Sequence, residues 1–407
     1  MDEPSRPPAE TLFDLPAVAP VPAATPGPAA PRLQRADRAQ VQLRPVDLEA
    51  LLPAEHRARL VWEWVMTLDL SAFHERIRAV EGHPGRPAID PAILVALWLY
   101  ATLEGVGSAR ALERLCREHD AYRWLCGGVS VNHHTLADVR VEHAAALDGL
   151  LTSSVAALLA EGLVSLERTA QDGLRVRAAA GEGSFRRRER ALARLPELEA
   201  RKARPTYRGR RDVPAEASTT DAEASFMRFP DGGSRPGWNV QLASDVGSGL
   251  VVGVDVVAVT DQGQLGPMVD QLGQRYGRTP AEHLVDGGYR HFGDLERLAG
   301  AESPTLVYMP VPRPRKGAPR DPHRPCRGDG PGVTAWRVRM GTEAAKAIYR
   351  GRSATAEWVN AGLHNRGLTA VTVRGRLKTL AVALWQALAH NLLGSLRLRA
   401  AAALPAT

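Results

Sequence analysis

The chain has 407 residues, 44% hydrophobic and 24% charged, which are ordinary proportions for a globular protein with two or three domains. No apolar run reaches the ~18 residues of a transmembrane helix, and no signal-peptide pattern opens the chain, so we expect a cytoplasmic protein without a membrane partner. The net charge of +7 is compatible with a polyanionic partner but does not establish one.

The first part of the chain predicts a tail and then a helical domain at residues 41–163. Residues 1–40 are rich in Pro and Ala and are predicted to be disordered. Residues 90–106 are apolar on every face, which predicts a buried helix that begins after Asp90-Pro91. Ser108 predicts the N-cap of the next helix.

More short helices are expected over residues 120–128 and 132–163. Tight turns between short helices fit a compact domain, and a helix-turn-helix DNA reader is one alternative for it. His133 and His134 could bind a metal. A cap or packing role is favoured, because adjacent positions on a helix point about 100° apart.

Strand signals begin after the helical region. Residues 163–178 read as a strand, and residues 237–259 read as a hairpin whose two Val-rich runs are broken at residues 247–249. Residues 261–280 have helical spacing that stops at Gly277. The expected fold is therefore α/β, with a mixed sheet flanked by helices.

The remaining elements extend this domain to residue 398, with a tail at 399–407. Short strands are expected at residues 283–289 and 304–312. A helix without Gly or Pro is expected at residues 352–361, and an apolar helix packed on the sheet at residues 377–403. A Pro/Arg-rich insertion at about 310–340 lacks periodicity and predicts a long loop.

A basic insertion interrupts the domain at about residues 175–211. It carries 13 Arg and Lys residues against four Glu, which predicts either a solvated basic helix or a helical arm along a DNA backbone. Arg186, Arg187 and Arg188 are the candidate phosphate contacts in this arm.

Three acidic residues stand where two-metal phosphodiester chemistry needs them. Asp172 and Asp286 close strand-like runs, and Glu357 lies in a later predicted helix. Strand, strand, helix is the order in which an RNase H-like core delivers three carboxylates to one site. Two Mg²⁺ ions, or Mn²⁺ in their place, take hard oxygen ligands and activate both the attacking and the leaving oxygen.

Each acid alone is equally compatible with a turn or a solvated surface position. The rival acids are Asp245, Asp255, Asp261 and Glu343. Possible DNA contacts or transition-state supports near Glu357 are Tyr349, Arg352, Asn360, His364 and Arg366. Trp358 is favoured as a core residue, with stacking on an unpaired base as the alternative.

The sequence resembles the DDE transposases of bacterial insertion sequences that have a helical N-terminal domain before an RNase H-like catalytic core. The resemblance rests on the motifs at residues 90–128, 131–140, 170–178, 219–227, 239–245, 284–289 and 349–368. It places the family's metal-binding acids on Asp172, Asp286 and Glu357. The family's Tyr-Arg-Glu signature falls on Tyr349, Arg352 and Glu357, although four residues separate the last two and His364 stands where a Lys or Arg is usual.

The resemblance implies a transposase that binds terminal inverted repeats, cuts double-stranded DNA there and joins the ends to target DNA. It also implies a homodimer on paired ends, acting in the bacterial cytoplasm at the nucleoid. The alternatives are an inactive or domesticated relative that only binds DNA, and a metal-dependent nuclease without strand transfer.

Overall fold

The computed structural model describes residues 47–77, 79, 87–187, 216–312 and 321–403. The tail predicted at residues 1–40 and most of the basic insertion lie outside these ranges. Residues 46–407 form one compact unit.

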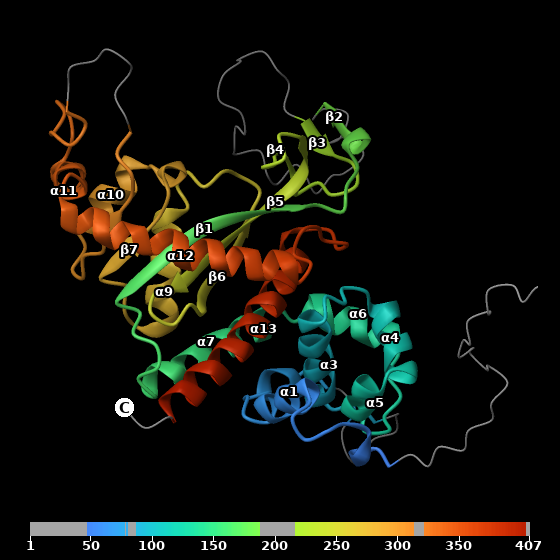
Figure 1. Ribbon diagram of the computed structural model, residues 1–407. Coiled ribbons are helices and arrows are strands. Elements are labelled where there is room, and N and C mark those ends of the chain that lie inside the picture. The colour runs from blue at the N-terminus through green and yellow to red at the C-terminus, as the bar shows by residue number, and fades with distance from the viewer. Residues whose placement is uncertain (1–46, 78, 80–86, 188–215, 313–320, 404–407) are drawn as a thin grey trace, which may run out of the picture. The chain divides into compact units, whose positions relative to one another are not determined.

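Helices fill the described chain before the first strand (Figure 1). They are η1 (Glu49–Leu51), α1 (Arg57–Val65), α2 (Ser71–His74), α3 (Pro91–Leu103), α4 (Ala109–Glu118), α5 (Asp120–Cys126), α6 (His133–Glu142) and α7 (Ala144–Ala160). No single helix in the described part of the chain is long and apolar enough to span a bilayer; only α6 and α7 taken together, as a bent pair, would pass on length and composition.

The predicted buried helix is confirmed as α3. All of its residues are buried, and the Asp90 side chain caps it by accepting from the Ala92 N–H at 2.8 Å. Ser108 caps α4 in the same way, as its sequence position predicts. His133 has a packing contact, since its Nδ1 lies 2.8 Å from Glu113 Oε2 on α4.

A six-stranded mixed sheet follows. Its strands are β1 (Arg168–Arg177), β4 (Ser225–Arg228), β5 (Ser234–Asp245), β6 (Val251–Val257), β7 (Glu282–Leu284) and β8 (Leu306–Tyr308). The order is β4-β5-β1-β7-β8, with β6 also paired to β5. β1, β7 and β8 run parallel, whereas β5 is antiparallel to its three neighbours. The β5–β6 hairpin is the one that the two Val-rich runs predict.

The helices of this half are α9 (Leu265–Tyr276), α10 (Phe292–Ala299), α11 (Pro331–Met340), α12 (Glu343–Asn365) and α13 (Arg376–Ala402). α9 ends at Gly277, whose φ of 70° is the left-handed conformation predicted for a helix stop. α12 lies along β1, and α13 contacts β6 as well as α3, α6 and α7 (Figure 1).

Three expectations need correction. The loop predicted at 310–340 ends in α11, which Pro331 starts at its first position. The predicted tail begins too early, because α13 continues through Ala402. The described part of the basic insertion contains no α-helix: residues 175–177 belong to β1, η2 (Glu182–Ser184) is a single 3-10 turn, and β2 (Phe185–Arg187) pairs with β3 (Glu216–Ser218) in a small separate sheet.

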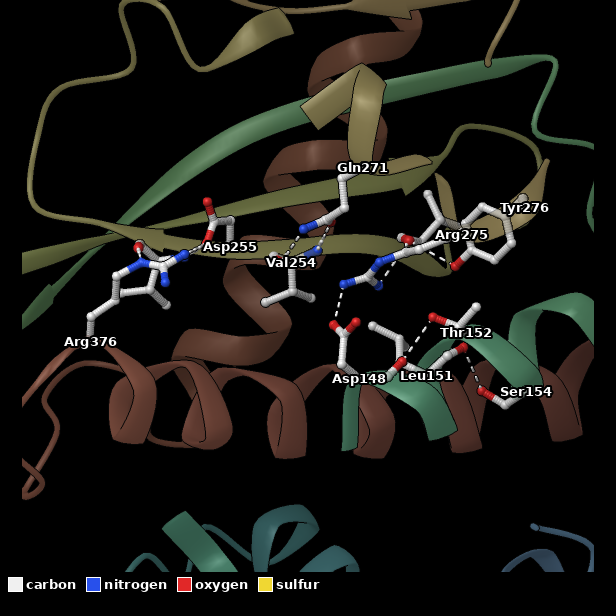
Figure 2. Close-up of polar contacts among 12 residues, drawn as sticks. Asp148, Leu151, Thr152, Ser154, Val254, Asp255, Gln271, Arg275, Tyr276 and Arg376 are labelled. Carbon is white, nitrogen blue, oxygen red and sulfur yellow. Dashed lines mark hydrogen bonds and ion pairs between the residues drawn. The ribbon is translucent and has the colours of Figure 1, made fainter. Parts of the chain in front are cut away.

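The outer edge of β6 is closed by side chains instead of another strand. An open edge strand leaves peptide groups unpaired and invites pairing with other chains. Figure 2 shows part of this closure. Four side chains form hydrogen bonds with backbone groups of β6: Asn391 with Val251, Tyr276 with Val252, Gln271 with Val254 and Arg376 with Val256. Beside them, the buried Arg275 of α9 forms an ion pair with Asp148 of α7, so the edge also joins the sheet to the early helices.

Candidate active site

Asp172 lies in the middle of β1 with its side chain toward α12. Its Oδ2 accepts a hydrogen bond from Asn360 Nδ2 at 3.0 Å, and its Oδ1 lies 3.4 Å from Arg352 Nη2. Both partners come from α12. The contacts join a strand and a helix that are about 180 positions apart in the chain.

The parallel register of β1 and β7 places Asp286 level with Asp172. Ala170 of β1 pairs with Leu284 of β7; Asp172 lies two positions after Ala170, and Asp286 lies two positions after Leu284. Asp286 comes just after β7 and caps the 3-10 turn η4 (Gly287–Tyr289) by accepting from the Gly288 N–H at 2.8 Å. The two carboxylates therefore lie side by side on neighbouring strands, where β7 ends and β1 continues.

Arg352 lies between these two carboxylates. Its Nη2 is 3.4 Å from Asp172 and 3.9 Å from Asp286, and the residue is only 8% exposed. Burial raises the pKa of Asp172 to about 6, and the Asp286 charge adds to the rise while Arg352 opposes it. One guanidinium therefore does not fully offset the cost of the buried acid.

Glu357 lies on the exposed side of α12 and makes no ion pair among the described residues. Burial raises the pKa of Tyr349, and the charges of Asp286, Asp172 and Glu357 raise it further against the opposing effect of Arg352. All three predicted acids are thus within electrostatic range of one hydroxyl.

The structure brings Tyr349, Arg352 and Asn360 to the acids but separates the other two candidates on this helix. His364 is exposed, and Arg366 lies past the end of α12, beside His390 of α13. The interpretation of Trp358 as a core residue is wrong. It is 48% exposed, with the Arg397 guanidinium 5.4 Å from its ring centroid.

Arg186 and Arg187 lie in the strand β2, whereas the prediction placed them in a helical arm. Arg188 lies outside the described residues.

A buried polar network supports the acids from the other side of β1. It runs through side-chain hydrogen bonds of 2.6–3.0 Å between Thr169, His283, Gln171, Gln241, Tyr289, Asn239 and Asp261. Burial lowers the pKa of His283 to about 3, so its ring is neutral and can accept from Thr169 while donating to Gln171. Linked polar groups of this kind hold a rigid platform under the site.

Asp261 is the functional candidate that the sequence did not select. Its Oδ1 accepts from both Asn239 and Gln241 at 2.8 Å, and its charge acts on Asp172 and Tyr289. In the sequence Asp261 is only one of the rival acids, because no motif in the surrounding residues distinguishes it. The polar residues Gln171, Asn239 and Gln241, set among apolar strand positions, were the available signal for a polar site beneath β1.

Gly173 allows this network to approach the strand. A Cβ at this position would lie 2.3 Å from Asp261 Oδ1 and 2.5 Å from Asn239 Oδ1. We expect Gly173→Ala to destabilise the fold by about 1–3 kcal/mol, because the buried network cannot move aside without losing hydrogen bonds. Urea denaturation measures this loss. Gly181→Ala is the matched control, since a Cβ there meets nothing within 4 Å; equal stability of the two variants would contradict the close approach.

The carboxylates have suitable chemistry for Mg²⁺, but they are not arranged around an ion. Among the described residues, no three His, Cys, Asp or Glu side chains are grouped closely enough to hold one. The positive charge of Arg352 lies between Asp172 and Asp286, in the place where a bound cation would neutralise the two carboxylates. The oxygen donors and the raised pKa of Asp172 therefore fit a cation, at least at this pair.

Residues 46–142 match the family model described as Transposase domain (DUF772). This match supports a transposase, and hence a DNA-processing enzyme. It covers η1 to α6 and ends before β1, so the acidic site lies outside it. Neither the curated proteins nor the solved structures contain a match to the chain.

Proposed function

We propose that the chain is a DDE-type transposase of a bacterial insertion sequence, with an RNase H-like catalytic half built on the mixed sheet. The observation that carries the proposal is the shared register of Asp172 and Asp286, which brings both within ion-pair distance of one residue of α12. The same helix bears Glu357. The match of the early helices to a transposase domain supports the same class of reaction.

Asp172, Asp286 and Glu357 would hold the two Mg²⁺ ions of such a site, with Mn²⁺ as a substitute. The ions supply an activated oxygen nucleophile and neutralise charge on the scissile phosphate. Asn360 fixes the orientation of Asp172 through its hydrogen bond, and the network below β1 prevents the strand from shifting. Arg352 partly offsets the charge of Asp172 and Asp286 in the free protein and is positioned to contact a phosphate that enters between them.

The partner in this proposal is double-stranded DNA, both as the ends of the insertion sequence and as the target. Two ends must be held together for their transfer, so we propose a homodimer that works on nucleoid DNA in the cytoplasm. Tyr349 is within electrostatic range of the acids, from where it would orient the DNA, whereas His364 and Arg366 lie outside this cluster.

The test is cleavage of a labelled duplex that carries the DNA flanking this gene, with and without Mg²⁺. We expect a cut at the boundary of a terminal repeat that requires the metal. Adding a target plasmid should then give joined products. Metal-independent cleavage, or no cleavage by protein that binds the duplex, would contradict the proposal.

The second candidate is an inactive relative that only binds DNA. One observation favours it: Arg352 pairs with both aspartates while Glu357 remains exposed on the surface of α12. A chain in which Arg352 permanently replaces the cation would bind repeats without cutting them. Binding without cleavage at any Mg²⁺ concentration distinguishes this candidate.

The basic insertion is expected to contribute phosphate contacts. Replacing Arg186, Arg187 and Arg188 together with glutamine should weaken the dependence of log K on log salt by about 0.9 for each lost contact. Fluorescence anisotropy at several salt concentrations measures this slope. A slope equal to that of the wild type would assign these residues to a solvated surface.

A further inference from the structure

A second polar site lies away from the acids, where the early helices meet the end of α12. It is a cavity of about 290 Å³ between α3, α6, the turn before α4, the segment after α12, and α13. Arg140 of α6 and Arg366 line it, together with Trp98, Trp385 and Gln386. The cavity therefore joins the stretch that matches the transposase domain to the half that carries the acids.

The two arginines have no carboxylate partner within ion-pair distance among the described residues. Arg140 donates to the Gly107 carbonyl and lies 5.1 Å from the Trp98 ring centroid. Arg366 Nη2 lies 3.2 Å from His390 Nδ1, and its Nε has no hydrogen-bond partner. Burial lowers the pKa of both arginines, to about 10 for Arg140, and no neighbouring acid opposes that effect.

His390 adds no third charge. Burial is the largest cause of the fall of its pKa to about 4, so the ring is neutral at pH 7. Its Nε2 donates to the Gly249 carbonyl at 3.0 Å, which leaves Nδ1 to accept from Arg366. The neutral His390 therefore leaves the positive charge of Arg366, which lines the cavity, without a counter-charge in the described part of the chain.

Two like charges deprived of water are costly without an anion. The arginine that pairs α9 with α7 illustrates the usual solution, since Arg275 has Asp148 as its counter-charge. The uncompensated charge is explained if an anion such as a phosphate completes the site.

We propose that this cavity binds one phosphodiester of the DNA backbone, which Arg140 and Arg366 contact together. The inference rests on the proposed function, because it takes DNA as the partner. Guanidinium groups match phosphate oxygens in pairs, and the cavity is near the lower limit of ~300–1,000 Å³ for small-ligand pockets, which suits one backbone unit. The shared phosphate would couple the early helices to the helix that carries Glu357.

The experiment measures the salt dependence of duplex binding by fluorescence anisotropy. The proteins are the wild type, Arg140→Gln, Arg366→Gln, the double variant and the control Arg399→Gln. Arg399 lies on α13 and pairs with Glu161 on the surface. A shared phosphate predicts that the double variant loses about 0.9 from the slope, no more than the stronger single variant.

The outcomes separate the two proposals. A wild-type slope in the double variant overturns the cavity site alone, whereas a loss of about 1.8 overturns the shared phosphate in favour of two separate contacts. Failure of the wild type to bind any duplex overturns the proposed function as well. Arg140→Lys and Arg366→Lys keep the charge, so they should keep the slope and lose only part of the affinity.

Phenylglyoxal modification of the wild-type protein tests the site without a folding risk. Mass spectrometry should show that DNA protects Arg140 and Arg366, while Arg399 reacts at an unchanged rate. Protection by inorganic phosphate but not by DNA would identify a site for a free anion and overturn the proposal. Equal reactivity with and without DNA would overturn it too.

Discussion

Replacing Asp286 with alanine is expected to slow DNA cleavage on the order of 10³-fold or more while leaving binding of the repeat within about twofold. The carboxylate would be a ligand of the metal and would act only on the reacting phosphate. The Asp286 side chain is 45% exposed, and its contacts are the 3.9 Å approach to Arg352 and the cap of the short 3-10 turn η4, so its loss should leave the fold intact. Single-turnover cleavage and anisotropy measure the two quantities separately.

Glu357→Gln should have the same effect on cleavage, and α12 provides its matched control. Glu343 is also exposed, belongs to the same helix and is a rival acid, but it lies in the first turn and pairs with Lys346. Glu343→Gln should cleave at the wild-type rate. If Asp286→Ala and Glu357→Gln both lose DNA binding, their assignment to the metal is wrong.

The strand elements of the site could be predicted because their signals are local. Asp286 follows the short strand β7, as predicted. Asp172 does not end its strand, because β1 continues to Arg177, yet the parallel pairing of β1 with β7 brings the two acids side by side. The start of α3, the Ser108 cap of α4, the β5–β6 hairpin and the stop of α9 at Gly277 also depend on neighbouring residues, and all of them are confirmed.

Features that depend on distant contacts could not be predicted. Asp261 joins the site through Asn239 and Gln241, some twenty positions earlier, and no spacing rule connects them. Arg366 follows Glu357 closely in sequence, yet the end of α12 carries it to the cavity beside Arg140. Trp358 is a large aromatic residue of the kind usually found in a core, but its side chain is 48% exposed to solvent.

Asp172→Asn is expected to stabilise the metal-free protein at pH 7 by as much as about 3 kcal/mol. This is the free energy that corresponds to a pKa rise from 3.8 to about 6 for a carboxylate that is 21% exposed. Asparagine resembles the protonated acid and can still accept from Asn360 or Arg352. Urea denaturation in EDTA measures the change, and Asp270→Asn, a half-exposed residue paired with Arg297, should alter stability by no more than about 0.5 kcal/mol.

The pH dependence of this gain follows from the direction of the shift. The folded-state pKa of Asp172 is above the unfolded value, so the wild type is not penalised below pH 3.8, where both states are protonated. As the pH rises from 3.8 to about 6, only the unfolded state loses its proton, and the wild type loses stability relative to Asp172→Asn. Above about 6 the gain should be constant. A variant less stable than the wild type at pH 7 would show that Arg352 already compensates the buried charge. A gain that persists at pH 3.5 would show that it does not come from the charge, and either result would mean that Asp172 carries no unmet demand for a cation.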